Sequence, residues 1–327
     1  MMRIMHRRSD GGFDASVDAL SLPKALSDPA GLTWVDFFDE PPDACARILS
    51  DVFHFHPLAI DDALKQSHVP RIDDWEAYLY IVLHAIAFDP AAEQMLTSIE
   101  LDIFAGPNYV VTHREQAMES LDRVWTGCAK DDRVMGKGAG RLLYHLVDEI
   151  VAGHMPVVDA IDEEMDRIED AILSSPGPRS LPAVLRIKRA LLHLRRIVAP
   201  QRETLNRLAR DQLSAIPAQE RVYFRDVYDH LVRLYDIVEG LRDLAVGALD
   251  TYLSVINNRM NEVMKTFTLI TTLFMPISFV TGFFGMNFFS PSDPPSWTGR
   301  FVLGAVCGAV VLVPALMYVW LRRRRWV

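Results

Sequence analysis

Two long apolar runs near the C-terminus constrain this chain more than any other feature. The first covers residues 263–284 and the second residues 301–320, and Lys265 is the single charged residue within them. Each run is about 20 residues long, and a helix of that length, rising ~1.5 Å per residue, crosses a hydrocarbon layer ~30 Å thick. Helices in a soluble core seldom stay free of charge for so long. The sequence therefore predicts an integral membrane protein with two transmembrane helices.

Basic residues around the two runs predict the orientation. Arg259 and Lys265 lie at the start of the first run, Arg322 to Arg325 follow the second, and the short connection carries only Arg300 at its far edge. Because Lys and Arg accumulate on the cytoplasmic side, we expect both termini in the cytoplasm and, for a bacterial protein, the inner membrane. Residues 1–12 contain no apolar segment of the kind a signal peptide needs. This agrees with an N-terminal part that does not cross the membrane.

The overall composition narrows the function class. With 327 residues, the chain is long enough for a soluble part beside the membrane part. The net charge of −9 makes nucleic acid an unfavourable partner. The sequence contains no phosphate-binding Gly-rich loop, nucleophile elbow or convergent acid–base pair, and we therefore predict that the protein is not an enzyme.

The first part of the chain, residues 1–135, mixes strand and helix patterns. Alternating apolar residues such as Ile99, Leu101 and Ile103 are typical of a strand with one buried face. The fold class that we predict is an α+β membrane protein whose N-terminal cytoplasmic domain is of α/β/α type. The expected strands are residues 32–37, 78–88 and a hairpin over 99–112, and the expected helices are residues 42–53, 57–65 and 115–125.

The pattern becomes entirely helical in residues 136–262. An acidic helix over 159–170 and a basic helix over 179–210 are joined by a Ser-Pro-Gly turn at 174–178, which predicts an antiparallel pair. A third helix is expected from Ala218. No strong breaker interrupts it before Pro276, so it would form a stalk about 100 Å long that continues into the first span. Residues 263–327 then form the two-helix membrane domain.

One face of the first span is polar or small. Steps of three and four residues connect Asn261, Met264, Thr268, Thr271, Met275, Ser278 and Gly282. Polar residues in a bilayer generally face water or the inside of a bundle, so this stripe is consistent with a pore. Ordinary helix packing also uses Thr, Ser and Gly, and the stripe alone does not decide between the two.

Gly285, Met286 and Asn287 follow the first run directly. A Gly-Met-Asn tripeptide between two C-terminal spans resembles the CorA family of divalent-cation channels, in which this motif stands at the outer mouth of the pore. The similarity extends through "NEVMKTFTLITTLFMPISFVTGFFGMN" (residues 261–287) and "HPLAIDDALKQSHVPRIDDWEAYLYIVLH" (residues 56–84). The resemblance implies a homopentamer around one pore, surrounded by lipid.

The resemblance also implies roles for individual residues. The selectivity motif would be Gly285, Met286 and Asn287. Phe267 takes the place that the three-and-four stepping assigns to Thr268, and we follow the resemblance there. The implied pore-lining residues are Asn261, Met264, Phe267, Thr271, Met275, Ser278 and Gly282. The opposite charges of residues 159–170 and 179–210 are either solvated faces or, as in the family, clusters that shape the field felt by the cation.

Two further segments resemble the halves of a cytoplasmic ion sensor. "HAIAFD" (residues 84–89) and "YFRDVYDH" (residues 223–230) imply that Asp89 and Asp226 hold a regulatory Mg²⁺ between neighbouring subunits. The alternative is that both are ordinary surface carboxylates.

The function that follows is a channel for Mg²⁺, with Co²⁺ or Ni²⁺ as further ions, gated by cytoplasmic divalent ions. A Zn²⁺ transporter of the ZntB-like branch is the alternative, because the loop "FFSPSDPPSWTGR" contains only one acid, Asp293, and lacks the Met-Pro-Glu-Leu pattern of the Mg²⁺ branch. A membrane-anchored sensor that transports nothing is a third interpretation. Ion flux through the purified protein in liposomes would separate that from a channel.

Overall fold

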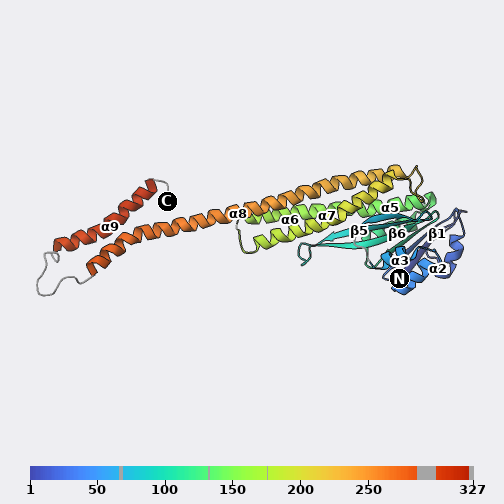
Figure 1. Ribbon diagram of the computed structural model, residues 1–327, viewed down its shortest axis with the longest axis horizontal. Coiled ribbons are helices and arrows are strands. Elements are labelled where there is room, and N and C mark those ends of the chain that lie inside the picture. Colours follow the sequence, from blue (N-terminus) through green and yellow to red (C-terminus); the bar gives the residue numbers. More distant parts are fainter. Residues whose placement is uncertain (66–68, 132, 175, 286–299, 324–327) are drawn as a thin grey trace. The chain divides into compact units, whose positions relative to one another are not determined.

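The chain forms two compact units, which comprise residues Met1–Asp250 (the N-terminal unit) and Thr251–Val327 (the C-terminal unit). The computed structural model describes residues 1–65, 69–131, 133–174, 176–285 and 300–323. Figure 1 shows the ribbon, with a sheet and most helices in the N-terminal unit and α9 beside the end of α8 in the C-terminal unit.

A mixed sheet forms the centre of the N-terminal unit. Its seven strands have the order β2-β1-β3-β7-β6-β5-β4. Only the β3–β7 pair is parallel among these strands. The strands are β1 (Met2–Arg7), β2 (Phe13–Asp14), β3 (Leu32–Phe38), β4 (Arg71–Asp74), β5 (Leu79–Phe88), β6 (Leu96–Ala105) and β7 (Tyr109–Arg114).

Helices cover both faces of this sheet (Figure 1). Strand side chains such as Val35, Tyr80 and Phe104 pack with α2 and α3 in one apolar core. On the opposite face α5, α6 and α7 contact β5. The helices are α1 (Leu22–Leu26), α2 (Pro42–Asp51), α3 (Pro57–Lys65), α4 (Glu119–Lys130), α5 (Ala139–Ala152), α6 (His154–Ser174), α7 (Ser180–Arg210), α8 (Arg221–Gly285) and α9 (Arg300–Arg323), with short 3₁₀ turns at Ala19–Ser21 and Met135–Lys137. The predicted α/β/α layering and fold class are confirmed.

Most expected elements are present, with four corrections. The helix expected over residues 115–125 begins only at Glu119, because Met118 is extended and its carbonyl accepts a hydrogen bond from Arg114. Strands β1, β2 and β4 were not expected from the sequence. β1 is rich in Arg, yet Ile4 and Met5 are buried and the strand pairs with β3 along its whole length.

The helical pair α6–α7 and the N-terminal part of α8 agree with the predicted pattern. In α8 the apolar stripe of Leu231, Leu234, Val238, Leu241 and Ala245 is buried. Two polar contacts set the antiparallel register of α7 and α8. Arg195 pairs with Glu239 at 2.8 Å, and the guanidinium of Arg202 lies 4.4 Å from the centre of the Tyr235 ring.

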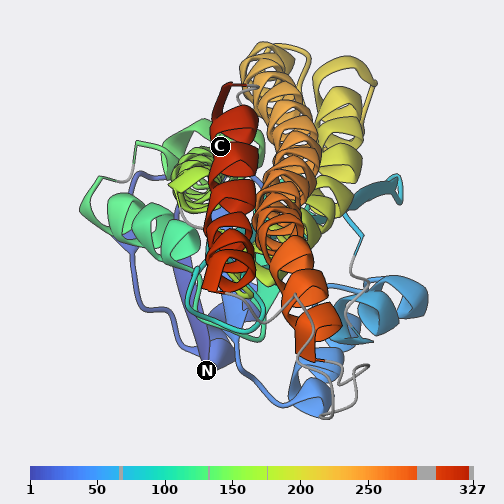
Figure 2. The ribbon, with the colours of Figure 1, turned by 90° about the vertical axis from the view of Figure 1, so that its left-hand side faces the viewer.

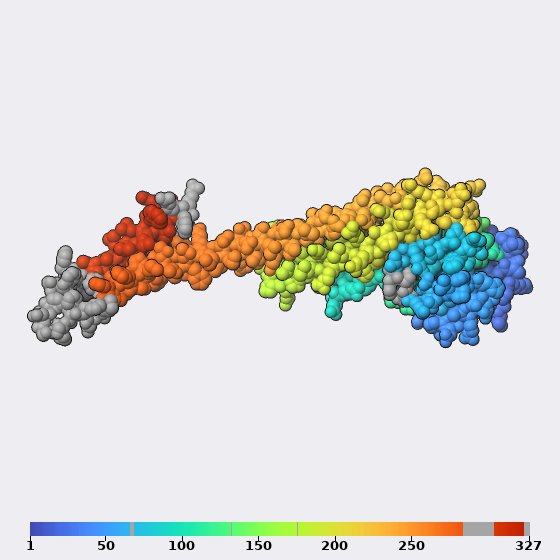
Figure 3. Space-filling view, viewed as in Figure 1, coloured from blue at the N-terminus to red at the C-terminus, as the bar shows by residue number. Residues whose placement is uncertain are grey.

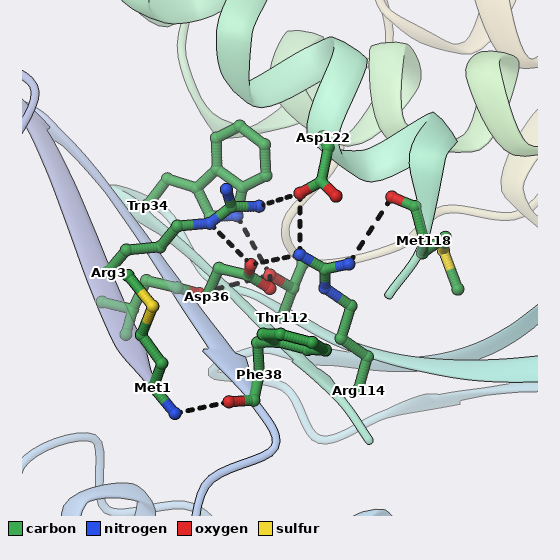
Figure 4. A network of polar contacts seen from close by, with 10 residues as sticks. Met1, Arg3, Trp34, Asp36, Phe38, Thr112, Arg114, Met118 and Asp122 are labelled. Carbon is green, nitrogen blue, oxygen red and sulfur yellow. Dashed lines mark hydrogen bonds and ion pairs between the residues drawn. The ribbon is translucent and has the colours of Figure 1, made fainter. Parts of the chain in front are cut away.

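A buried ionic network ties the sheet to α4 (Figure 4). Asp36 is fully buried, and its carboxylate accepts hydrogen bonds from Arg3 Nε (2.8 Å), Arg114 Nη2 (3.2 Å) and Thr112 Oγ1 (2.7 Å). The Nη2 atoms of Arg3 and Arg114 also reach Asp122 on α4, at 2.7 and 2.8 Å. Each charge in the network has a partner of opposite sign, which is what buried charges require.

Removal of the central carboxylate should therefore be costly. We expect Asp36→Ala to lower the free energy of unfolding by about 3–5 kcal/mol, because it removes the buried partner of Arg3 and Arg114 and leaves the half-exposed Asp122 as the one carboxylate for both guanidinium groups. Denaturation in urea, followed by tryptophan fluorescence, measures the change. Asp243→Ala is the matched control, since Asp243 is an exposed helix residue paired with Arg242, and it should have little effect. Equal effects of the two variants would contradict this assignment.

Candidate ion path and regulatory carboxylates

The seven residues predicted to line a pore lie on one exposed face of α8. Asn261, Met264, Phe267, Thr271, Met275, Ser278 and Gly282 are all exposed within the chain. The exposed fractions of the larger apolar members are high, at 60% for Met264, 63% for Phe267 and 67% for Met275. Thr268 is exposed as well, so exposure does not distinguish it from Phe267.

The opposite face of α8 is the one that α9 covers. Leu269, Leu273, Ile277 and Val280 recur at three- and four-residue steps and are half-buried. On α9, the residues Val306, Val310, Pro314 and Met317 form a similar half-buried stripe, which ends at the buried Leu321. The two helices lie side by side in both ribbon views (Figures 1 and 2). One copy of the chain thus leaves the predicted pore face open.

Hydroxyl groups on this part of α8 fall into two classes. Thr266, Thr268 and Thr281 donate to carbonyls one turn earlier, at 3.0, 2.8 and 2.9 Å. Such bonds satisfy a hydroxyl without help from water. Within the described part of the chain, the hydroxyls of Thr271, Thr272 and Ser278 have no hydrogen bond; Thr271 and Ser278 belong to the exposed face, and Thr272 is half-buried. An unsatisfied hydroxyl in hydrocarbon is costly, which favours water or another copy of the chain beside this face.

The helix continues through Pro276 to Gly285, its last residue. Pro276 has no N–H to donate to the carbonyl of Thr272, so one backbone acceptor within the candidate span lacks its helical partner. Of the predicted selectivity motif, Gly285 ends the helix, whereas Met286 and Asn287 lie outside the described residues.

Both helices qualify as membrane spans by length and composition. The candidate segments are Arg221–Phe283, which includes the stalk, and Gly304–Arg323. In the most apolar window of each, 0% and 6% of the residues are buried, which distinguishes them from core helices of a soluble protein. The structure thus contains two helices that are long and apolar enough to form the two predicted transmembrane spans.

Asp89, the first predicted regulatory carboxylate, lies in the turn between β5 and β6. It is exposed, and its Oδ1 accepts a hydrogen bond from the backbone N–H of Ala91 at 2.8 Å. Arg186 of α7 holds this turn by donating to the carbonyl oxygens of Pro90 and Ala92, at 3.1 and 2.5 Å. The turn is visible beside α6 and α7 in the space-filling view (Figure 3).

Asp226, the second predicted carboxylate, is exposed near the start of α8. Its neighbours on α5 are Tyr144 and Asp148. Burial raises the pKa of Asp148, and the negative charge of Asp226 contributes to the rise. The sequence pattern did not indicate Asp148, because its approach to Asp226 depends on how α5 packs against α8.

The structure does not bring Asp89 and Asp226 of one chain together. The Arg195–Glu239 and Arg202–Tyr235 contacts place Arg186, which holds the Asp89 turn, at the level of residues 248–250 of α8. Asp226 is more than 20 residues earlier on α8, which corresponds to roughly 30 Å along the helix axis. Among the described residues, no group of three or more His, Cys, Asp or Glu could hold a metal ion. A shared ion would have to join two chains.

The sequence of this chain is similar to those of known ion transport proteins. Residues 29–323 match the family model described as CorA-like Mg2+ transporter protein. The cobalt/magnesium transport protein CorA of Thermotoga maritima is 33% identical over 296 residues, which cover 90% of this chain and 83% of that protein. The zinc transport protein ZntB of Yersinia enterocolitica is 25% identical over 312 residues, which cover 93% of this chain and 90% of that protein.

The same fold occurs in a solved structure. The complete structure of the CorA magnesium transporter from Methanocaldococcus jannaschii has a TM-score of 0.84 to this chain at 23% identity, and 99% of each chain is covered. At this identity the match shows the fold alone. It covers both units of the chain.

Proposed function

Because the chain belongs to the CorA family of divalent-cation transporters, we propose that it is a homo-oligomeric channel, a pentamer, that carries Mg²⁺ across the membrane. The observation that carries this proposal is the open polar face of α8, which lies opposite the face covered by α9. Two spans from one chain cannot enclose a water path. Several copies with their α8 faces turned inward would enclose one and would give the hydroxyls of Thr271 and Ser278 their missing partners.

The chemistry of this face suits an ion that keeps its water. Mg²⁺ loses water reluctantly, so amide and carbonyl oxygens can hold it through its hydration shell. We assign the outer ring of such oxygens to Asn287 of the Gly-Met-Asn motif. Rings of Met264, Phe267 and Met275 offer apolar constrictions that close by loss of water, which requires no charge to be neutralised.

The ion itself is open to one alternative. The relatives include a protein named for cobalt and magnesium and one named for zinc. The connection between the spans contains a single acid, Asp293, and lacks the Met-Pro-Glu-Leu pattern of the Mg²⁺ branch. Zn²⁺ is therefore the alternative transported ion. We assign Mg²⁺ as the main ion, with Co²⁺ and Ni²⁺ as further substrates. Liposomes loaded with Mg²⁺-selective or Zn²⁺-selective dyes distinguish these assignments directly.

We place both termini and the N-terminal unit in the cytoplasm. The basic residues that flank the spans, with four consecutive Arg after the second, support this orientation. The membrane would be the bacterial inner membrane.

Flux measurements with an Asn287 variant test the proposal. We expect Asn287→Ala to lower Mg²⁺ flux into liposomes at least about tenfold, because it removes the ring of oxygen acceptors at the pore mouth. Native mass spectrometry should still show the parent oligomer. Gly285→Val is the contrasting variant and should impair assembly as well as flux, since a bulky residue at the end of α8 hinders the turn out of the helix. Parent-like flux and selectivity in Asn287→Ala would contradict the assignment.

Cysteine labelling tests the pore face independently. In a Cys307→Ala background, we expect Thr271→Cys and Ser278→Cys to react with a charged, membrane-impermeant thiol reagent at least about tenfold faster than Leu273→Cys and Val280→Cys, because only the first pair would face water. All four positions lie on the same helix and at similar depth, so access is the variable that differs. Equal labelling rates for the two pairs would contradict the proposal that this face of α8 lines the water-filled pore.

For regulation, we propose that Asp89 of one copy and Asp226 of the next share a Mg²⁺. Both carboxylates are exposed, and among the described contacts neither pairs with a basic side chain. Two such acids repel each other unless a cation lies between them, so the ion would hold neighbouring copies together and its loss would favour the open pore.

The double variant Asp89→Asn/Asp226→Asn should keep conducting at internal Mg²⁺ concentrations that close the parent. We expect the concentration for half-inhibition of flux to rise at least about tenfold, because neutral amides bind a hard cation far more weakly. Asp61→Asn is the control, since Asp61 is an exposed acid that pairs with Lys65. Inhibition that matches the parent would show that the sensor lies elsewhere.

A further inference from the structure

A groove with a basic wall lies between α7 and the start of β6 in the N-terminal unit. Its volume is about 670 Å³, and the described residues that line it include three arginines, Arg186, Arg189 and Arg196, together with His193. Glu93 is the only carboxylate among them. The groove adjoins a second hollow of about 590 Å³ that shares Gln94, His193 and Arg196, and the far part of that hollow is lined by Glu100 and Glu115. Of these residues, only Arg186 has a role described above, since it holds the turn that carries Asp89.

The basic residues belong to one face of α7. Positions 186, 189, 193 and 196 are separated by three, four and three residues, which places their side chains in a single row along the helix. Arg189 and Arg196 are about 10 Å apart along the axis. That spacing lets one elongated ligand reach both guanidinium groups.

The arginines in this row differ from Arg195 and Arg207 of the same helix, which have carboxylate partners. Arg195 pairs with Glu239 and Arg207 with Asp211, so these charges are balanced within the chain. In the groove, Arg189 donates only to the carbonyl of Leu185 in its own helix, and Arg196 makes no ion pair or hydrogen bond within the described part of the chain. Arg186 is oriented by two backbone carbonyls of the β5–β6 turn, which do not neutralise it. The wall therefore keeps its positive charge.

We propose that this groove binds a soluble polyphosphate anion of the nucleoside triphosphate class. Guanidinium groups match phosphate oxygens in a bidentate geometry and keep their charge at any physiological pH. Arg189, His193 and Arg196 would contact the phosphates. The side-chain amide of Gln94 could donate a hydrogen bond to the same phosphates. Leu192 and the buried Met95 and Leu96 give the groove an apolar part. That part suits the nucleoside.

Isothermal titration of the full-length protein in detergent tests the proposal. The ligands are ATP, inorganic triphosphate, AMP and inorganic phosphate, each with EDTA present. We expect ATP and triphosphate to bind saturably and AMP and phosphate at least about tenfold more weakly, because one phosphate reaches only part of the basic row. Tighter binding of ATP than of triphosphate would measure the contribution of the apolar part. Excess Mg²⁺ should weaken ATP binding, since it neutralises part of the ligand's charge.

The double variant Arg189→Gln/Arg196→Gln should lose ATP affinity at least about tenfold. Arg210→Gln is the matched control, because Arg210 is an exposed arginine of the same helix outside the groove, and it should bind like the parent. Absence of saturable binding by ATP and triphosphate would overturn the proposal. So would a control whose loss of binding free energy is half that of the groove variant or more, because the control removes one charge and the groove variant two, and such a ratio would indicate attraction to net charge alone. The binding measurement does not depend on transport, and the ion flux of the same variants is measured separately. A failure of this proposal can therefore be distinguished from a failure of the channel assignment.

Discussion

The structure depends on one helix, α8, that must satisfy two different surroundings along its length. Its backbone bonds are made within the helix, so the side chains alone decide what each part of α8 can contact. From Phe224 to Ala245 the helix buries one apolar stripe against its own unit, as a soluble helix does. After residue 250 the half-buried stripe of Leu269, Leu273 and Ile277 faces α9, and the remaining faces carry both large apolar and small polar residues. In the proposed channel, a bilayer and other copies of the chain would cover these remaining faces.

Periodicity predicted the elements whose pattern is local. The β6–β7 hairpin, the α6–α7 pair and the long α8 follow from alternation, turn residues and apolar steps that a short window contains. Strand β1 is different, since its Arg3 looks like a solvated residue until Asp36 of β3 and Asp122 of α4 are brought beside it. β4 is short and acidic and owes its place to pairing with β5. Pairing with a neighbouring strand, and not the propensity of their own residues, formed both strands.

The candidate site shows the same division. The row of exposed residues on α8 could be predicted because helical spacing alone places Asn261 and Ser278 on one face. The separation of Asp89 from Asp226 could not, because it depends on the register that Arg195 and Glu239 set between α7 and α8. The basic groove was visible in the sequence only as a basic helix. Its significance depends on which arginines have carboxylate partners, and a sequence pattern does not contain that information.

The register of α7 on α8 has a consequence for how this protein would sense an ion. Two acids roughly 30 Å apart on one chain cannot act as a chelate within that chain. Each copy in a closed ring would contribute half of two different sites, one to each neighbour. An ion bound at one site would restrain both copies that form it, and each of these copies also forms half of the next site. Ions would therefore bind cooperatively around the ring. An isolated copy would have no response at all, and sensitivity to the ion would belong to the assembly.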